Sequence, residues 1–125
     1  MEGEVITMKI FTYYQQDGKV IDRFDSKGAV IHPLVKSEKP FQIGCMYLDR
    51  NSILGMHKAM CPQLFIVTDG SGWVRVEGGE KIPVEKGTAV FWETGEEHES
   101  GSDTGMTAIV AEGEEFDPER FLNLK

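Results

Sequence analysis

The sequence is poor in cysteine and has no long apolar run. Its 125 residues include two cysteines, Cys45 and Cys61, which are too few for the disulfide network of a small secreted domain. Both are expected to remain free thiols in a reducing compartment. No segment approaches the roughly 20 apolar residues that a membrane-spanning helix needs, and the N-terminal segment lacks the basic start and apolar stretch of a secretory signal. These absences predict a cytoplasmic protein that does not associate with membranes.

Basic residues are also scarce. Lys and Arg total 13 against 21 Asp and Glu, so that the net charge is −8 and the isoelectric point lies near 4.8. A chain with this charge repels a phosphate backbone, which excludes nucleic acid as an expected partner. The expected partner is a small molecule.

Most of the chain lacks helical periodicity and instead shows short apolar runs bounded by turn residues. It contains 14 glycines, and 10% of its residues are aromatic, a composition typical of all-β proteins. Without intervening helices, such runs predict a sandwich or barrel. Residues 1–27 are expected to form an N-terminal arm or outer strands, and residues 28–125 the barrel. The strand candidates are 28–35, 41–48, 52–57, 63–69, 72–77, 80–85, 88–93, 97–101 and 105–112.

Glycine-containing turns separate several of these candidates. The segments "TDGSGW" and "EGGEK" predict two tight hairpins, and no dinucleotide-binding or phosphate-binding glycine pattern is present. After the last candidate, Asp117 and Pro118 are expected as the N-cap and first residue of a short C-terminal helix.

The candidate "QLFIVTD" is apolar on both faces and therefore needs two covers. The barrel interior supplies one. The N-terminal arm or a second subunit would supply the other, and a homodimer is the prediction that we favour.

His57 and His98 flank the part of the chain that is richest in turns. Because the intervening strands reverse direction repeatedly, we expect the two imidazoles to converge and mark a pocket. A single buried histidine is usually structural, but two at these positions favour a binding or catalytic role. His32 is expected to be structural or on the surface.

The stretch from residue 55 to residue 98 resembles the cupin superfamily, whose small barrels carry the motifs H-x-H with a later Glu and Gly, and P-x-G-x-x-H. The wider sequence is also similar to small bacterial single-domain cupins. The resemblance implies a cupin-type double-stranded β-helix, or jelly-roll barrel, in which the matching side chains act together. The matching positions are His57, Gln63 and Gly70 in the first motif, and Gly95 and His98 in the second.

Three positions depart from the family pattern. Ala59 replaces the second histidine, Gln63 the glutamate, and Glu93 the proline. The family's metal ligands, three histidines and one carboxylate, are thereby reduced to His57, His98 and the amide of Gln63. Such a set could hold Zn, Ni, Fe or Mn weakly, with water molecules completing the coordination.

Other side chains could complete or line the pocket. Cys61 lies near its expected mouth and is either a packed thiol or a soft ligand. Glu93 and Glu97 are candidate replacement anions, whereas strand alternation is expected to turn Glu99 away from His98. The expected apolar lining residues are Phe65, Trp92, Met46 and Met56, with Tyr47.

Two functions follow from this pocket. The first is a metal-dependent enzyme of the oxygenase, isomerase or lyase type that acts on a small polar molecule, with His57, Gln63 and His98 as ligands. The second is a metal-free module that binds a sugar or small acid through the same side chains. The sequence does not decide whether the protein is an enzyme.

Overall fold

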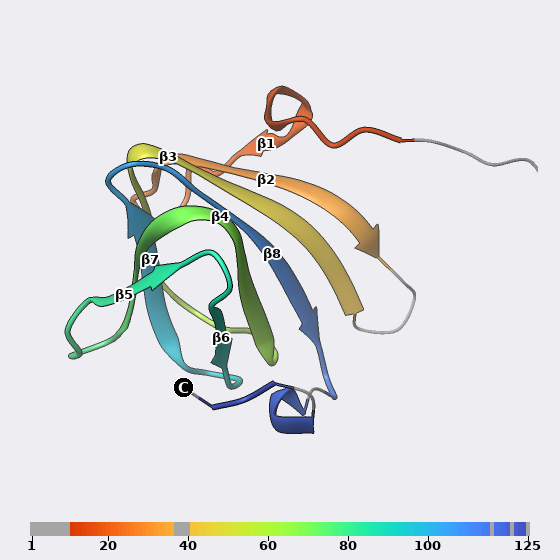
Figure 1. Ribbon diagram of the computed structural model, residues 1–125, viewed down its shortest axis with the longest axis vertical. Coiled ribbons are helices and arrows are strands. Elements are labelled where there is room, and N and C mark those ends of the chain that lie inside the picture. Colours follow the sequence, from red (N-terminus) through yellow and green to blue (C-terminus); the bar gives the residue numbers. More distant parts are fainter. Residues whose placement is uncertain (1–10, 37–40, 116, 121, 125) are drawn as a thin grey trace, which may run out of the picture.

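The structure, a computed structural model, describes residues 11–36, 41–115, 117–120 and 122–124 and shows an all-β barrel (Figure 1). This confirms the predicted fold class. The elements are η1 (Gln15–Asp17), β1 (Lys19–Val20), β2 (Lys27–Lys36), β3 (Phe41–Lys58), β4 (Gln63–Val76), β5 (Ile82–Glu85), β6 (Ala89–Trp92), β7 (Glu97–Ser102), β8 (Met106–Gly113) and η2 (Pro118–Arg120).

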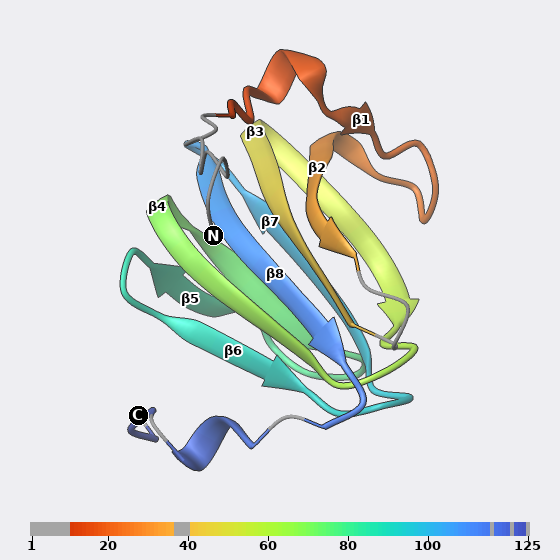
Figure 2. The ribbon, with the colours of Figure 1, turned by 90° about the vertical axis from the view of Figure 1, so that its right-hand side faces the viewer.

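Two long, bent strands give the barrel its shape. Residues 41–48 of β3 pair with β8, and residues 52–58 pair with β7. In the same way, residues 63–70 of β4 pair with β8, whereas residues 73–76 pair with β7. Every ladder is antiparallel, and β3 and β4 curve around the molecule in Figures 1 and 2. The strand candidates on either side of residue 50, and on either side of residue 70, are therefore halves of single strands.

The hairpin predicted at "TDGSGW" is instead a bend within β4, so this prediction was wrong. Gly70 lies at the bend with a φ of 74°. A Cβ atom there would lie 2.2 Å from the carbonyl oxygen of Gly105. The turn that contains Gly105 can therefore pack this closely against β4 only because residue 70 has no side chain. Glycine within a strand marks a bend or close approach as readily as a hairpin. The "EGGEK" turn does connect β4 to β5, with Gly78 at a φ of 77°.

Strand alternation separates the core from the outside of the barrel. Along β4, Phe65 and Val67 are each 2% exposed, whereas Leu64 and Ile66 remain partly exposed. The two buried side chains join a core that includes residues from β3, β6 and β8. The same alternation decides which polar side chains point inward.

The predicted C-terminal helix is a single 3-10 turn, η2. Its start is as predicted, because Oδ1 of Asp117 accepts a hydrogen bond of 3.2 Å from the backbone N–H of Glu119. Short helices are marginally stable in water, because few backbone hydrogen bonds form for the residues that become ordered. This accounts for a single turn in place of a longer helix. Across the described part of the chain, no helix has the length and apolar character needed to cross a bilayer.

Candidate functional site

His57 and His98 lie directly opposite each other on β3 and β7. Opposed residues in an antiparallel pair project from the same face, and the two ring centroids are 4.5 Å apart with their planes tilted by 56°. A β-bulge between Leu54 and His57 interrupts the ladder just before this pair. Bulges bend a strand and re-aim its side chains. The structure thus brings together the two histidines that the sequence singles out.

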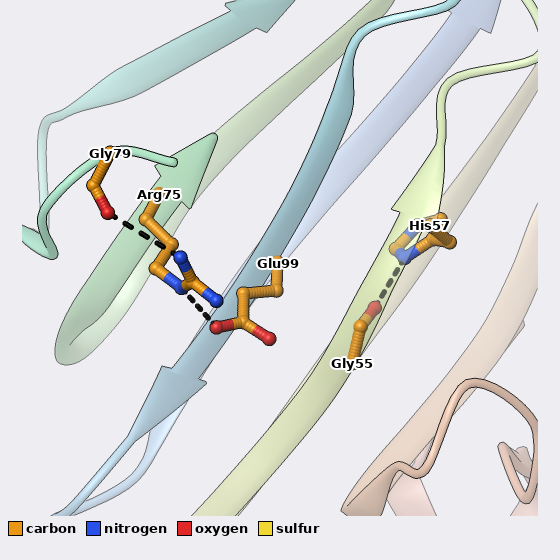
Figure 3. A network of polar contacts seen from close by, with 5 residues as sticks. All are labelled: Gly55, His57, Arg75, Gly79 and Glu99. Carbon is orange, nitrogen blue, oxygen red and sulfur yellow. Dashed lines mark hydrogen bonds and ion pairs between the residues drawn. The ribbon is translucent and has the colours of Figure 1, made fainter. Parts of the chain in front are cut away.

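Each imidazole is oriented by a backbone carbonyl two residues earlier in the chain. Nδ1 of His57 lies 2.6 Å from the oxygen of Gly55 (Figure 3), and Nδ1 of His98 lies 3.0 Å from the oxygen of Glu96. A carbonyl oxygen can only accept a hydrogen bond, so both Nδ1 atoms carry a proton. In the neutral rings, both Nε2 atoms therefore keep a free lone pair. This form of imidazole binds a metal or accepts a hydrogen bond from a ligand.

His98 is enclosed by aromatic side chains. It is 2% exposed, and its ring stacks on the indole of Trp92 with 3.9 Å between centroids and 15° between planes. Phe65 packs edge-on against Trp92 at 5.7 Å. Burial lowers the pKa of His98 and outweighs the opposing effect of its hydrogen bond to Glu96, while the proximity of His57 lowers the pKa further. The ring is therefore held in its neutral form.

Phe24, which belongs to no recognisable sequence motif, covers His57. The two rings are stacked, with centroids 4.6 Å apart and planes at 20°. Phe24 and Asp25 have φ angles of 61° and 54°, and the N–H of Ser26 donates to the oxygen of Arg23 at 3.1 Å. Residues 23–26 thus form a type I′ turn, which normally takes Asn and Gly at its centre. A left-handed backbone at phenylalanine is strained and persists only where its surroundings enforce it.

Gly55 is one of the residues that hold this turn in place. Its N–H donates to Oγ of Ser26 at 3.2 Å, and a Cβ atom on Gly55 would lie only 1.5 Å from the oxygen of Phe24. The turn can therefore lie on β3 only because residue 55 has no side chain. A glycine inside a strand, two residues before a motif histidine, is the sequence signal that could have located this contact.

The five rings form a contact series in the order Phe24, His57, His98, Trp92 and Phe65. Two of the predicted lining residues, Phe65 and Trp92, belong to this series. A separate hollow of about 570 Å³ beside η1 is lined by residues 14–16, none of which is part of the ring series. The imidazoles are thus packed between aromatic side chains.

Gln63 and Cys61 both lie beside Glu112 of β8. Gln63 is in register with Trp92 of β6 and with Glu112 of β8, and it shares the inner face of β4 with Phe65. Sγ of Cys61 lies 4.0 Å from Oε2 of Glu112. Burial raises the pKa of this thiol, and the charge of Glu112 adds to the effect. A protonated thiol is a poor metal ligand.

The two methionines expected in the lining differ in their surroundings. Met46 is 6% exposed and belongs to the core, in register with Ala108 of β8. Met56 is partly exposed and lies in the bulge just before His57. Met56 is therefore nearer to the histidine pair along the chain.

Glu99 takes the orientation that strand alternation predicts. It faces Arg75 directly across β7 and β4, on the opposite face of β7 from His98, and the two side chains form an ion pair (Figure 3). Arg75 also donates to the oxygen of Gly79 at 3.4 Å. The carboxylate of Glu99 is thereby engaged away from the imidazoles.

The other two candidate anions also lie elsewhere. Glu97 hydrogen-bonds to Glu77, which raises the pKa of the exposed Glu77 carboxyl. Glu93 is exposed, and its N–H donates to Oε1 of Glu96 at 3.0 Å. Within residues 11–36, 41–115, 117–120 and 122–124, no three His, Cys, Asp or Glu side chains form a group that could hold a metal ion.

The donors that are present fit a resident catalytic metal poorly. Such sites usually have three protein ligands and often an anionic one. Here two neutral imidazoles lie together, and Gln63 would add only a neutral amide oxygen. The rings are also engaged in stacking on Phe24 and Trp92. The arrangement is better suited to accepting hydrogen bonds than to holding a cation without charge compensation.

Comparison with known proteins identifies the architecture. No protein-family model and no curated protein matches the sequence. Among solved structures, a cupin-like protein from Thermotoga maritima has a TM-score of 0.72 and 20% identity, over 85% of this chain and 81% of that chain. A Cupin 2 conserved barrel domain protein from Salinispora arenicola has a TM-score of 0.71 and 14% identity, over 87% and 91%. A predicted oxalate decarboxylase from Thermotoga maritima has a TM-score of 0.67 and 19% identity, over 81% and 96%. This likeness shows that the chain has the cupin barrel fold.

Proposed function

We propose that this barrel binds a small polar molecule without a metal, and that the ligand donates hydrogen bonds to Nε2 of His57 and Nε2 of His98. The observation that carries the proposal is the pair of Nδ1 contacts with the backbone oxygens of Gly55 and Glu96. These contacts fix both rings in the tautomer whose Nε2 atom accepts. Hydroxyl or amine groups on the ligand would supply the donors.

The aromatic neighbours have separate roles in this proposal. Trp92 holds the ring of His98 in place and keeps it neutral by excluding water. Phe24 lies on His57 and is 43% exposed, so a ligand that reaches His57 displaces its phenyl ring. The strain of the left-handed turn lowers the cost of that displacement, because the turn relaxes when it leaves Gly55.

The alternative is a metal-dependent enzyme of the oxygenase, isomerase or lyase type. It is favoured by the same free Nε2 lone pairs, because a metal needs neutral imidazoles in this form. Gln63 would be its third ligand. We rank it second because neither Cys61, Glu93, Glu97 nor Glu99 supplies the missing anion.

Elemental analysis and thermal denaturation together test the proposal. The protein would be purified without a chelator or affinity tag, analysed for Zn, Ni, Fe and Mn, and melted with neutral sugars and polyols in the presence and absence of EDTA. We expect less than about a tenth of an equivalent of metal and a ligand-dependent rise in melting temperature that EDTA does not change.

Two variants make the result specific. His57→Phe should abolish the ligand-dependent rise, whereas His32→Gln, on β2, should retain it. Near-stoichiometric metal that is lost in His57→Ala or His98→Ala would overturn the proposal in favour of the enzyme.

A further inference from the structure

The outer face of one sheet of the barrel is apolar. This sheet consists of β2, residues 41–48 of β3, β8, residues 63–70 of β4, and β6, paired in that order, and Figure 2 looks onto it, with β8 near the centre. Because Met46, Ala108 and Phe65 point into the core, the residues next to them in each strand point outward. The outward side chains form two adjacent rows in register, Phe91, Leu64, Ala111 and Ile43 in the first, and Ala89, Ile66, Ile109, Cys45 and His32 in the second.

These two rows are uncharged but are not fully covered. In the described chain, neither row contains Asp, Glu, Lys or Arg, and every member except the buried Cys45 is partly exposed. Leu64 and Ile66 belong to the strand for which the sequence requires a second cover. Asp69 lies exposed toward one end of the face, in register with Thr107. An apolar area with a polar margin is typical of a protein–protein interface.

The outer face of the other sheet differs. Glu97 and Glu99 of β7 point outward there, because His98 between them points inward, and Arg75 of β4 is in register with Glu99. The protein carries a net charge of −8, so two copies repel each other at long range. They avoid close contacts between carboxylates only where the surfaces that meet are uncharged. The apolar face is therefore the one that fits a second copy of the same chain.

The first described residues lie on this side of the barrel and lead away from it. The hydroxyl of Tyr47, an outward residue of β3, donates to the oxygen of Tyr13, whose ring meets His32 edge-on at 6.5 Å. Phe11 is 81% exposed, and the segment before η1 runs away from the barrel in Figure 1. A segment that turned back over its own barrel would bury Phe11. The apolar residues that precede Phe11 are Val5, Ile6, Met8 and Ile10.

The area of the face indicates what these N-terminal residues must add. With strands about 4.8 Å apart and residues about 3.3 Å apart, the face from β2 to β6 covers about 400 Å² alongside residues 41–47. A stable interface buries about 800 Å² on each partner, so the face alone supplies about half of this area. Ten extended residues reach about 33 Å, which is more than the width of the face. Residues 1–10 of a second copy are long enough to supply the rest.

We infer that this face is the interface of a homodimer, in which the outer faces of two copies pack about a two-fold axis and residues 1–10 of each copy lie against its partner. Both copies then bury the same two rows. Removal of these apolar side chains from water drives the association. The inference is independent of the proposed function, because His57 and His98 project from the inner side of the other sheet.

Sedimentation equilibrium of the full chain at several concentrations tests the inference. We expect the unmodified protein to have twice the mass of the 14.0 kDa chain. Ile109→Glu should raise the dissociation constant of the dimer about a hundredfold or more, because the two-fold axis brings two uncompensated carboxylates into apolar surroundings. Ala111→Glu should act in the same direction, although it replaces only a methyl group.

A double variant with Val5→Asp and Ile6→Asp tests the part taken by residues 1–10. Adjacent residues of an extended segment point to opposite sides, so one of the two charges faces the partner whichever side is in contact. The dissociation constant should rise about tenfold or more. Ile82→Glu is the control, because Ile82 of β5 is 60% exposed and lies in the other sheet. It should leave the dissociation constant within about twofold.

Circular dichroism spectra like that of the unmodified protein verify that each variant is folded. A monomer at every concentration would overturn the inference, as would a dimer that Ile109→Glu and Ala111→Glu do not weaken. Equal weakening by Ile82→Glu would also overturn it, since added charge would then act irrespective of its position. Unchanged dimerisation of the double variant would overturn the place given to residues 1–10.

Discussion

The imidazole ring of His98 lies nearly parallel to the indole ring of Trp92, 3.9 Å away. Because burial lowers the pKa of His98, the unfolded chain binds a proton at this residue more readily than the folded one. The folded state therefore keeps its full stability, as far as His98 is concerned, above the unfolded pKa of about 6.5. It loses stability as the pH falls through the lower native pKa, because protonation of His98 favours the unfolded chain. We expect the melting temperature of the unmodified protein to fall between about pH 7 and about pH 5 more steeply than that of His98→Phe. A His32→Gln control should keep the original slope, and an unchanged slope in His98→Phe would contradict the prediction.

Gly55→Ala should dislodge the turn that carries Phe24. The added methyl group would collide with the oxygen of Phe24, and overpacking of this kind costs about 1–3 kcal/mol. Urea denaturation measures the loss, and the NMR shifts of the His57 ring protons should change as the phenyl ring moves away. Gly95→Ala is the control, because its Cβ atom would meet nothing within 4 Å and only its φ of 86° opposes the change. Equal losses in the two variants would mean that the collision is relieved without moving the turn.

Asp25→Gly should stabilise the protein. Asp25 is exposed, with a φ of 54°, at the turn position that favours glycine. Relief of the left-handed strain is worth about 1 kcal/mol, although the greater freedom of glycine in the unfolded chain offsets part of this gain. Asp22→Gly, a neighbouring exposed residue without a positive φ, should instead destabilise by about 0.5–1 kcal/mol. Denaturant titrations of both variants measure the difference, and a loss of stability in Asp25→Gly would show that the aspartate side chain matters more than the strain.

Arg75→Met should destabilise the fold by about 2 kcal/mol. Glu99 has a side chain only 11% exposed, and the substitution leaves its carboxylate without a cation. The magnitude is below that of a fully buried pair because the Arg75 side chain is 30% exposed. Adding Glu99→Leu should restore most of the loss, as a double-mutant cycle would show. A loss in the double variant equal to the sum of the losses in Arg75→Met and Glu99→Leu would mean that the pair is not coupled.

Much of the architecture could be predicted from the sequence because it depends on alternation and turn residues. The apolar runs located almost every strand, and the Asp117 cap was correct. The prediction of a hairpin at Gly70 was wrong for a physical reason. The same short sequence permits either a chain reversal or a bend within a strand, and the choice depends on the contact with Gly105, which lies in a turn distant in sequence.

The candidate site was predictable in part. The positions of His57 and His98 in the sequence predicted that their side chains converge, and the structure places the two residues in register on β3 and β7. Phe24 was not predictable, because its contribution depends on a left-handed backbone that phenylalanine rarely adopts.

The course of β3 and β4 through both sides of the barrel also bears on its opening motions. The β7 side and the β8 side of the barrel cannot unfold separately, because β3 and β4 each pair with both β7 and β8. Amide hydrogen exchange should therefore find residues 41–48 and 52–58 protected to a similar degree and released together, as one cooperative unit. Only segments outside these ladders, such as the turn at Phe24, can open on their own.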